Sequence, residues 1–357
     1  MIIKENGIRG GLMAINVLIT GVGDALGLAV IKALKDKNNI NIYGGDADQF
    51  AAGLYSESIL GSKCLPYANN SLYKKEILNY CKMKNIDVFI PGSGAEVISV
   101  SKFKDEFKDI QTNLLIPDYK TVMKAADKSQ TIELARGTSV SHPKTIKITK
   151  QKYDLDYIFS SLELPLIIKP CRSQGAKGVK YIYEQKELEY KINEVLEEYN
   201  DILVQELIPG KQGSMYLYGT VLNKKNNFKT DFVSRSLKTK FPTGGPAIVG
   251  ESLKNDQVKK YGREIINALG DWVGPVNVEF MLDPRDKQFK LIEINPRLWG
   301  YGYLATGAGI NFPKLVVDLA LDKEVSYNDD YEQGKVLIRK TEDIIIDKSD
   351  LVSKDDK

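Results

Sequence analysis

The chain has 357 residues, of which 43% are hydrophobic and 27% charged, and its formal net charge is +3. This length favours two or three packed units, and the composition is typical of a soluble globular protein. The mild charge argues against a nucleic-acid partner or an anionic membrane surface, and no run approaches the ~20 apolar residues of a membrane span. Three distant cysteines and a single histidine disfavour a disulfide framework and a histidine-rich zinc site, and they fit a cytoplasmic protein.

The first twelve residues show no clear hydrophobic period. Met13 directly precedes the first predicted strand. We expect either that Met13 is the natural start or that residues 1–12 are a disordered tail or an upstream extension.

The first part of the chain alternates strand and helix patterns. Residues 15–20 and 40–48 are predicted strands, residues 25–37 a helix, and residues 86–98 a strand, a glycine turn and a helix. Such alternation predicts a parallel sheet with crossover helices. We expect this unit to end near Pro117.

Three glycines, Gly21, Gly23 and Gly27, lie between the first strand and the first helix. Their spacing has one residue more than the G-x-G-x-x-G dinucleotide fingerprint, so we expect a tight turn and close helix–sheet packing. The start of the helix, near Gly21 and Gly23, is a candidate site for an anionic substrate group, and Glu96 is a further candidate substrate contact. Asp46 ends the second strand, where dinucleotide enzymes place a ribose-binding acid, so a nicotinamide-dependent oxidoreductase stays open as an alternative.

The second part of the chain has a different pattern. The strand predicted at residues 201–210 ends at a Pro-Gly break, and residues 276–295 form a predicted hairpin. Further strands are predicted at 164–183 (two, joined by a loop rich in small and basic residues), 214–222 and 228–236, and helices at 256–270 and 313–321. The charged tail after about residue 345 is expected to fray.

The predicted hairpin carries two glutamates. If its turn centres on Asp286, alternation places Glu279 directly across from Glu293, and like charges in such a pair destabilise a sheet. A divalent cation between them would reverse the sign, because two carboxylates and the Asn295 amide oxygen are the hard oxygen ligands that Mg²⁺ takes. Arg297 follows shortly and can reach a phosphate. A solvent-facing acidic strand pair is the alternative, but the Asn-Pro-Arg sequence favours the metal site.

Basic and small residues follow the predicted strand that ends in Lys169. A lysine at a strand end either covers apolar surface with its stem or meets a phosphate. The next loop has flexible backbone that could close over phosphates, but it lacks the P-loop pattern, and alone it is more typical of a plain hairpin loop. Its candidate residues are Ser173, Gly175, Lys177 and Gly178.

Four segments then form an ordered set. Lys128 at the start of a helix, the IIKP strand with its glycine-rich loop, VQELIPG, and the pair VEFML…LIEINPR follow one another along the chain. In this order they resemble the motifs of ATP-grasp enzymes over roughly residues 15–330. The chain is similar in particular to the branch of the carbamoyl-phosphate synthase large subunit, with a single ATP-grasp unit.

The resemblance implies an α/β protein in which a Rossmann-like parallel-sheet domain precedes a two-lobed α+β ATP-grasp domain. We expect the Rossmann-like domain at residues 13–118, the ATP-grasp domain at 119–330, and a C-terminal strand or tail at 331–357. The first lobe, with the lid loop, would comprise residues 119–200, and the second lobe, with the metal site, residues 201–330. Analogy with the family also suggests a homodimer.

The resemblance implies roles for single residues as well. Glu206 would bind the adenine amino group beside the backbone of Leu207 and Ile208. The family often uses an acid for the ribose, and here either Gln212 replaces it as a neutral partner or the ribose contact lies elsewhere. Arg235, and Gly244 and Gly245 in a loop at 244–246, are candidate contacts for the phosphate or the acceptor, with a basic surface strand as the equal alternative. The remaining implied roles are phosphate binding by Lys128, Lys169, Ser173, Gly175, Lys177 and Gly178, binding of Mg²⁺ or Mn²⁺ by Glu279, Glu293 and Asn295, and catalysis by Lys169, Arg235 and Arg297.

The implied activity is that of an ATP-dependent carboxylate–amine ligase acting on small-molecule acids and amines. A substrate carboxylate would attack the γ-phosphate of ATP, and an amine would then displace phosphate and leave an amide or peptide bond. Phosphorylation of bicarbonate or carbamate, as in carbamoyl-phosphate synthase, is the second reading. The nicotinamide-dependent oxidoreductase and a non-catalytic ATP-binding regulator are the others.

Overall fold

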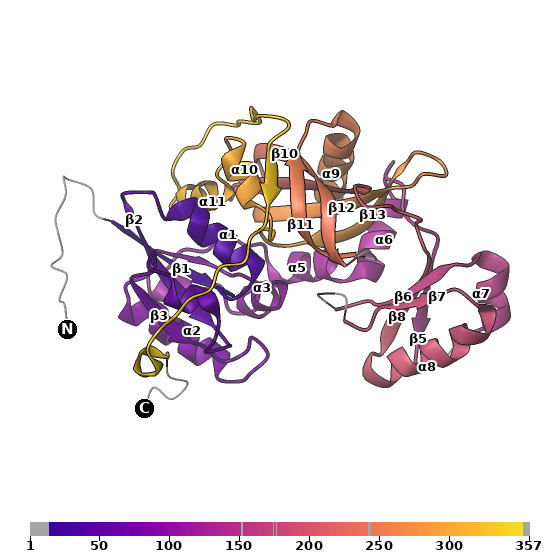
Figure 1. Ribbon diagram of the computed structural model, residues 1–357, viewed down its shortest axis with the longest axis horizontal. Helices are drawn as coiled ribbons and strands as arrows, with labels where there is room; N and C mark the ends of the chain where they lie inside the picture. Colours follow the sequence, from indigo (N-terminus) through magenta and orange to yellow (C-terminus); the bar gives the residue numbers. More distant parts are fainter. Residues whose placement is uncertain (1–13, 151–152, 174, 176, 242–243, 353–357) are drawn as a thin grey trace.

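The computed structural model describes residues 14–150, 153–173, 175, 177–241 and 244–352. These residues form three sheets (Figure 1). A parallel sheet (sheet A) and a four-stranded antiparallel sheet (sheet B) lie at opposite ends of the molecule, with a six-stranded antiparallel sheet (sheet C) between them. The expectation for residues 1–12 falls outside the described part of the chain.

Sheet A comes first in the chain. Its elements are β1 (Ile15–Thr20), α1 (Ala25–Leu34), β2 (Ile40–Asp46), the 3₁₀ helix η1 (Ala52–Tyr55), β3 (Gly61–Cys64), α2 (Tyr73–Met83), β4 (Val88–Ile90), α3 (Gly94–Ser101) and α4 (Glu106–Asp109). The strand order is β3-β2-β1-β4 and every neighbouring pair is parallel, as predicted. Both faces of β1 are buried, because Val17 and Ile19 pack with α1 and Leu18 packs with α2 and α3.

The glycines after β1 have the structural task that their spacing predicts. Gly21 adopts φ +62°, and a Cβ at Gly27 would lie 2.4 Å from the Gly21 carbonyl oxygen, so only glycine fits where α1 meets the turn. The Asp46 carboxylate accepts a hydrogen bond of 2.8 Å from the Gly23 N–H. The acid on which the dinucleotide reading depends is therefore used to close the turn itself.

Sheet B has the strand order β5-β8-β6-β7. Its elements are β5 (Thr145–Thr149), α7 (Leu155–Ser161), β6 (Leu166–Pro170), β7 (Lys180–Ile182), the 3₁₀ helix η2 (Gln185–Glu187), α8 (Leu188–Glu198) and β8 (Asp201–Glu206). Alternation along β8 separates two faces, because Ile202 and Val204 pack with α7 and α8 while Leu203 packs elsewhere. Leu203 pairs with Lys169 on β6, so Lys169 lies on the face that the two helices leave uncovered.

Sheet C has the strand order β13-β12-β9-β10-β11-β14. Its strands are β9 (Met215–Leu222), β10 (Phe228–Phe241), β11 (Gly244–Ser252), β12 (Gly274–Leu282), β13 (Phe289–Asn295) and β14 (Val336–Ile338), and its helices are α5 (Tyr119–Ala126), α6 (Lys128–Arg136), α9 (Asp256–Leu269), α10 (Tyr303–Gly307) and α11 (Phe312–Ala320). Tyr218, Val278 and Phe280 pack with α5, α6 and α9 on one face. Leu217 and Phe232 pack with α10 and α11 on the other.

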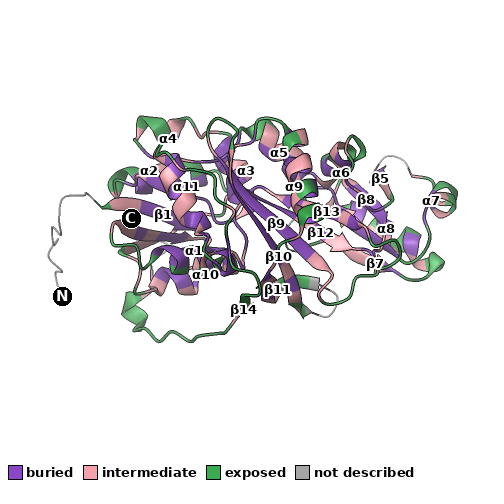
Figure 2. Ribbon diagram, turned by 90° about the horizontal axis from the view of Figure 1, so that it is seen from above, coloured by how far each residue is buried: buried purple, intermediate pink, exposed green. Residues whose placement is uncertain are grey.

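Sheets A and C share one hydrophobic core. Leu217 and Phe232 of sheet C belong to the same buried cluster as Val17 and Ile19 of sheet A. Figure 2 shows this continuous buried region between the two sheets, whereas sheet B has a core of its own. The first unit and the second lobe are therefore joined by apolar packing as well as by the chain.

The β12–β13 hairpin departs from strict alternation at a single point. Alternation predicts that Leu291 shares the face of Glu293 and that Ile292 shares the face of Ile294. The structure has a bulge there, since Glu279 pairs with Glu293 and the next residue of β12 pairs with Leu291. Leu291 and Ile294 both enter the core, and Ile292 is the extra, half-buried residue. That prediction was wrong because a bulge shifts the period by one residue.

The C-terminal segment returns to sheet A. β14 pairs antiparallel with β11 at the edge of sheet C. The chain then runs along the surface to the 3₁₀ helix η3 (Lys348–Asp350) beside sheet A (Figure 1). The Val352 N–H donates to the Tyr55 hydroxyl at 3.3 Å, so the part of the tail up to residue 352 is docked, where the sequence predicts fraying.

A buried carboxylate on β10 ties three segments together. Asp231 accepts hydrogen bonds from Arg263 of α9 (2.5 Å), from the Tyr327 hydroxyl (2.5 Å) and from the Tyr218 hydroxyl. Burial alone would raise its pKa, but these donors outweigh burial and hold the pKa below the ordinary 3.8. The charged form is therefore the one that the fold stabilises.

Replacement of this carboxylate tests the network. Asp231→Asn is expected to lower the free energy of unfolding at neutral pH by about 3 kcal/mol, because it leaves the Arg263 charge without its partner. Since the native pKa of Asp231 is depressed, its contribution is present above pH 3.8 and is lost as the pH falls through the native pKa. Urea unfolding at neutral and acidic pH measures both effects. Asp329→Asn, which removes a partly exposed partner of Lys259, is the control and is expected to cost less than about 1 kcal/mol; equal losses in the two variants would contradict the network.

Candidate active site

The β12–β13 hairpin places two carboxylates side by side, as predicted. Glu279 pairs with Glu293, and Asn277 pairs with Asn295 in the neighbouring position. Burial and the charge of Glu293 raise the pKa of Glu279 to about 8, and the charges of three cationic side chains act against that rise. The three are Arg297, Lys128 and Lys169.

Lys169 on β6 faces these carboxylates from sheet B. Burial lowers its pKa to about 8, the charge of Glu293 opposes this shift, and the nearby Lys128 adds to it. Lys128 begins α6, as predicted, and its Nζ donates to the Ser173 carbonyl at 2.8 Å. Two lysines therefore stand opposite two glutamates, with one lysine bonded to the glycine-rich loop.

The glycine-rich loop is described in part. Ser173, Gly175, Lys177 and Gly178 lie between β6 and β7, which pair as an antiparallel hairpin, and residues 174 and 176 fall outside the described part. Gly175 and Gly178 have φ of +63° and +72°, a region that favours glycine. The covering of phosphates by these residues stays a prediction.

The donor set of the hairpin fits a divalent cation bound together with phosphates. No group of three or more His, Cys, Asp or Glu side chains among the described residues is arranged to hold a metal ion alone. Glu279 and Glu293 supply two hard oxygen ligands, and the Asn295 amide lies 3.1 Å from the Glu293 carboxylate. Mg²⁺ is commonly held by one or two carboxylates and completed by substrate phosphates. A half-turn of the Asn295 amide would present its oxygen to the same point.

Arg297 is held beside the hairpin. Its Nη1 donates to the Leu298 carbonyl at 2.8 Å and its Nη2 to Asn295 Oδ1 at 3.2 Å. Among the described residues, no carboxylate forms an ion pair with Arg297, although the charge of Arg297 lowers the pKa of Glu279. A half-buried guanidinium of this kind can bind a phosphate or carboxylate oxygen.

Glu206 is already engaged in the structure. It ends β8, where its Oε1 accepts from the Lys144 N–H at 2.9 Å and its Oε2 accepts from Arg285 at 2.9 Å. The Leu207 N–H donates to the Pro165 carbonyl at 2.9 Å. Within the described chain, the Ile208 N–H has no acceptor. The Leu207 N–H is therefore used internally, whereas the Ile208 N–H is free for a nucleobase. Each Glu206 oxygen has one protein donor and can accept a further hydrogen bond, so its adenine contact stays a prediction.

Gln212 is bonded within the protein, and its ribose role stays a prediction. Its side-chain Nε2 donates to the Thr239 hydroxyl at 3.0 Å, and its Oε1 accepts from the Thr239 N–H at 2.9 Å. Both ends of the amide therefore tie the segment after β8 to β10. The sequence near Gln212 does not predict its hydrogen bonds with Thr239, because Thr239 lies on a strand distant in the chain.

The structure also contradicts the placement of Arg235. Glu279 pairs with Leu217, and Leu217 pairs with Ser234, so these three side chains share one face of sheet C. Arg235 is the next residue and points to the opposite face, where it pairs with Glu251 at 2.7 Å. A catalytic contact from Arg235 to groups bound at Glu279 is therefore not supported.

The expected loop at 244–246 is a strand. Gly244 begins β11 and pairs with Phe241, and Gly245 has φ +93°. The β10–β11 hairpin is longer than the sequence predicts, because register shifts let the two strands keep pairing. A substrate contact from Gly244 or Gly245 stays a prediction.

The first unit meets the second next to this site. A Cβ at Gly300 would lie 3.2 Å from the Ala25 Cβ, so the segment after Arg297 packs on the start of α1, the helix that follows the turn of Gly21 and Gly23. Glu96 is buried in α3, which packs on sheet A, and accepts from the Tyr73 hydroxyl at 2.9 Å and from the Ser93 hydroxyl at 3.1 Å. Burial raises the pKa of Glu96. Substrate contacts from these residues stay predictions.

Three further residues border the site and were missed in the sequence. Burial raises the pKa of Tyr301, and the negative charge of the nearby Glu279 raises it further. Arg339 donates to the Gly300 carbonyl at 2.8 Å, and burial lowers its pKa. Arg285 holds Glu206. Tyr301 follows the EINPR motif and could have been found there, whereas no local pattern marks Arg285 or Arg339.

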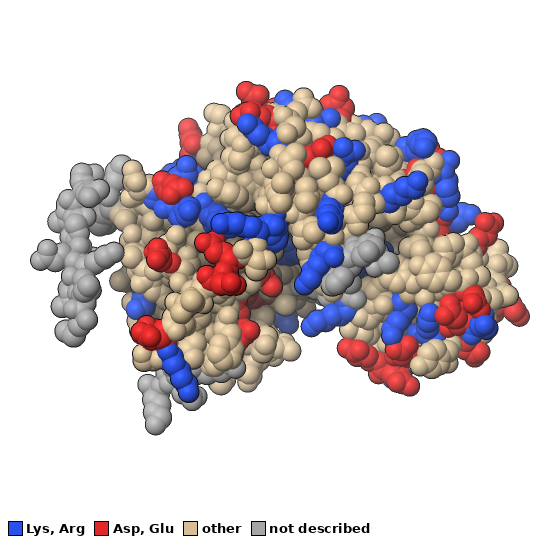
Figure 3. Space-filling view, in the orientation of Figure 1, with Lys and Arg blue, Asp and Glu red and all other residues tan. Residues whose placement is uncertain are grey.

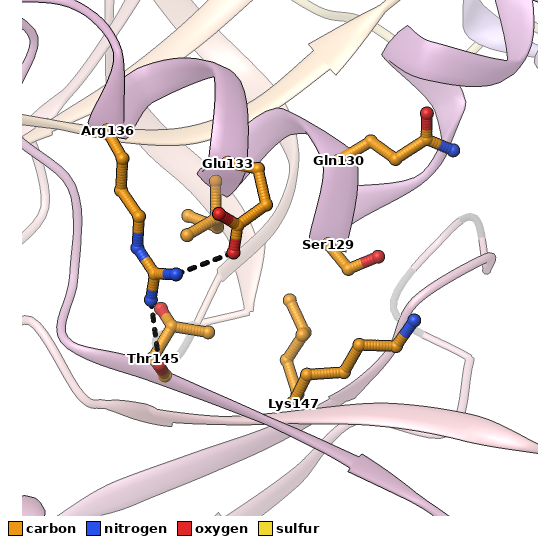
Figure 4. A pocket seen from close by; sticks show the side chains of 8 residues that line it. Ser129, Gln130, Glu133, Arg136, Thr145 and Lys147 are labelled. Atoms are coloured by element: carbon orange, nitrogen blue, oxygen red, sulfur yellow. Dashed lines mark hydrogen bonds and ion pairs between the residues drawn. The ribbon is translucent and has the colours of Figure 1, made fainter.

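The surface around this region is basic. Lys and Arg side chains border the hollow in the middle of the face shown in Figure 3. A separate cavity of about 320 Å³ lies between α6 and β5 (Figure 4), and none of the predicted site residues lines it. Its Arg136 is neutralised by Glu133 at 2.6 Å. The site therefore consists of the facing surfaces of sheets B and C, and this cavity lies outside it.

Residues 125–301 match the family described as the ATP-grasp domain. This segment contains both lysines, the hinge after β8 and the whole β12–β13 hairpin. These residues therefore form an ATP-grasp domain.

Particular relatives extend the comparison. The chain is 27% identical over 226 residues to the arginine-specific carbamoyl phosphate synthase large chain of Bacillus subtilis (strain 168), which covers 60% of this chain and 21% of that protein. It is 21% identical over 299 residues to D-aspartate ligase of Enterococcus faecium (strain Aus0004), covering 76% of this chain and 69% of that protein. The chain thus spans about a fifth of the first relative and about two thirds of the second.

Solved structures share the fold. An L-amino acid ligase from Bacillus licheniformis has a TM-score of 0.65 at 18% identity, with 87% of this chain and 75% of that chain covered. The biotin carboxylase domain of 2-oxoglutarate carboxylase from Hydrogenobacter thermophilus has a TM-score of 0.71 at 17% identity, with 91% of this chain and 74% of that chain covered.

None of the helices within the described ranges has the length and apolar character needed to cross a membrane.

Neutralising one carboxylate of the hairpin separates stability from metal binding. In a chelating buffer at a pH above the pKa of Glu279, which is about 8, Glu293→Gln is expected to raise the free energy of unfolding by about 0.5–1 kcal/mol, because it removes one of two like charges that face each other across a strand pair. The same variant should lose most of the thermal stabilisation that Mg²⁺ with ATP gives the wild type. Differential scanning fluorimetry with and without Mg²⁺ and ATP measures both.

The exposed Glu57 supplies a charge-matched control, since Glu57→Gln changes net charge away from the site. It should leave both quantities at their wild-type values. A Glu293→Gln variant that is less stable than wild type in chelator, or that gains as much from Mg²⁺ and ATP, would contradict the arrangement.

Proposed function

We propose that the chain is an ATP-dependent carboxylate–amine ligase that releases ADP and phosphate. The observation that carries this proposal is the pairing of Glu279 with Glu293 opposite Lys169. This arrangement gathers negative and positive groups at one point between two sheets, which suits the binding of a metal–nucleotide complex. The ATP-grasp domain at residues 125–301 supports the same activity.

The chain's own residues would bind and neutralise the reacting groups. Glu279, Glu293 and Asn295 would hold Mg²⁺ or Mn²⁺, which when bound offsets charge on the phosphate oxygens. Lys128 from the start of α6 and Lys169 from sheet B would bind ATP phosphates, and Arg297 would bind the transferring phosphate or the substrate carboxylate. The Ile208 N–H would read the edge of the adenine.

The reaction needs no nucleophile from the protein. The substrate carboxylate would attack the γ-phosphorus, the bond from that phosphorus to the ADP oxygen would break, and an amine would then displace phosphate from the acyl phosphate. The glycine-rich loop that follows β6 would exclude water from the acyl phosphate. D-aspartate ligase and the L-amino acid ligase, whose names describe ligation of amino acids, support amino acids as substrates.

Phosphorylation of bicarbonate or carbamate is the second candidate. The similarity to the carbamoyl phosphate synthase large chain favours it. If ADP release requires bicarbonate and no added carboxylic acid, the chain has this activity and is not a carboxylate–amine ligase. The structure does not favour the nicotinamide-dependent alternative, because the Asp46 carboxylate accepts from the Gly23 N–H and closes the turn after β1.

An ADP-release assay tests the proposed function. With Mg²⁺ and ATP, panels of amino acids, small acids and amines are expected to yield an acid–amine pair that releases ADP and forms an amide detectable by mass spectrometry. Glu293→Ala should lower turnover at least about 100-fold, since charge neutralisation supplies most of the catalysis, and its circular dichroism should match the wild type. ATP binding without turnover on any panel would instead indicate a non-catalytic regulator, and full activity of Glu293→Ala would overturn the metal site.

The phosphate role of Lys169 has a separate test. Lys169→Ala is expected to weaken ATP binding about tenfold, because it removes a charge-assisted contact to the phosphates. Calorimetric titration with ATP and Mg²⁺ measures the affinity. Lys186→Ala, which removes an exposed lysine from the same lobe, is the control. Equal affinity in the two variants would assign Lys169 to packing.

A further inference from the structure

The carboxylate that ends β8 lies between two sheets. Glu206 Oε1 accepts from the Lys144 N–H of sheet B, and Oε2 accepts from the Arg285 guanidinium, which belongs to the turn between β12 and β13. The side chain of Glu206 is only 15% exposed. It therefore joins the end of a sheet B strand to the hairpin of sheet C that carries Glu279.

Arg285 is fixed before it reaches Glu206. The Asp283 carboxylate is fully buried and accepts from the Arg285 Nε at 2.9 Å and from its Nη2 at 2.6 Å. The backbone N–H of Arg285 also donates to Asp283 at 3.0 Å. This paired contact orients the guanidinium, so less side-chain entropy is lost when the same Nη2 bonds to Glu206.

Neighbouring contacts pull the same two segments together. The Leu282 N–H donates to the Ser214 carbonyl at 2.9 Å. A Cβ at Gly210 would lie 2.3 Å from Met281 Sδ, so Met281 packs directly on that backbone. The segment after β8 and the end of β12 are thus joined at three points, of which the Glu206–Arg285 pair is the one that involves charges.

We propose that Glu206, Asp283 and Arg285 form a hinge clamp that positions the backbone of Ile208 relative to the carboxylates of the β12–β13 hairpin. The proposal rests on the proposed function, since it assigns the adenine edge to Ile208 and the phosphates to Lys169 and the hairpin. Arg285 is a positioning residue. It contacts no nucleotide itself, and it acts through Glu206.

This arrangement has a consequence for base selection. The adenine end and the phosphate end of ATP are held by different sheets, and the clamp sets the distance between them. Loosening it should weaken ATP binding and reduce the preference for ATP over GTP, because the backbone that reads the base no longer has a single position. Lys169 and Arg297 are untouched, so turnover at saturating ATP should change little.

A double-mutant cycle tests the clamp. Arg285→Gln, Glu206→Gln and the double variant are compared by calorimetric titration with ATP and with GTP, by steady-state kinetics, and by urea unfolding without nucleotide. Each single variant is expected to raise the KM for ATP about 3- to 10-fold and to narrow the ATP:GTP ratio of kcat/KM similarly, the size of one charge-assisted hydrogen bond. The double variant should match Arg285→Gln, because the contact with Glu206 is already lost in that background.

Asp286→Asn is the control, because it removes the Asp286–Lys290 ion pair of the same turn (2.6 Å) without touching Glu206. It should leave the KM and the base preference unchanged. If Glu206 instead binds the adenine amino group directly, Glu206→Gln will weaken ATP binding further in the Arg285→Gln background, and this additivity overturns the clamp. An Arg285→Gln variant that behaves like Asp286→Asn also overturns it. A wild-type chain that binds no ATP overturns the proposed function, which is a result distinct from normal binding in every variant.

Discussion

The cross-strand pairing of Glu279 with Glu293 is the constraint on which the candidate site depends. Two carboxylates in this position repel each other and are partly removed from water, and both effects raise the pKa of Glu279. A sheet with this pair gains stability only when positive charge is supplied nearby. Lys169 of sheet B, Lys128 of α6 and Arg297 supply part of it, and a bound divalent cation would supply the rest. The negative charge that remains at the two glutamates is therefore suited to hold the metal ion of a metal–nucleotide complex, while the cationic side chains are suited to its phosphates.

The three sheets around this pair are packed on one another to different extents. Sheets A and C share one hydrophobic core, so the hairpin, the segment after Arg297 and the start of α1 form a continuous body. Sheet B has its own core and meets this body through a small apolar cluster, formed by Ile132 of α6 with Cys171 and Leu203, and through polar contacts. The polar contacts include the hydrogen bond from Lys128 to Ser173 and the ion pair of Glu206 with Arg285. Sheet B is therefore attached to the rest by less apolar packing than sheets A and C share with each other.

The predictions that held have a local physical origin. The glycine turn, the parallel order of sheet A and the register of the β12–β13 hairpin each follow from period, spacing and turn chemistry within a few residues. Contacts that the sequence did not predict involve distant partners. The family resemblance implied a contact of Arg235 with the phosphate or the acceptor, yet pairing with β9 turns it to the other face. Gln212 meets Thr239 of β10, a pairing that no short-range pattern contains. The bulge at Ile292 is a local feature that alternation alone does not predict. One extra residue in β13 reverses the faces of the β13 residues that precede it.

By itself, the sequence determined the class of fold, the residues able to bind a cation and phosphates, and the register that brings the two glutamates together. These are properties of alternation and of side-chain chemistry along short stretches. Only the tertiary structure decided which protein groups the candidate residues already contact, because those partners come from distant strands and turns. Glu206 shows the distinction most clearly, because its motif predicts an adenine contact, and the packing of two sheets adds contacts of its carboxylate with Lys144 and Arg285 that no local pattern contains.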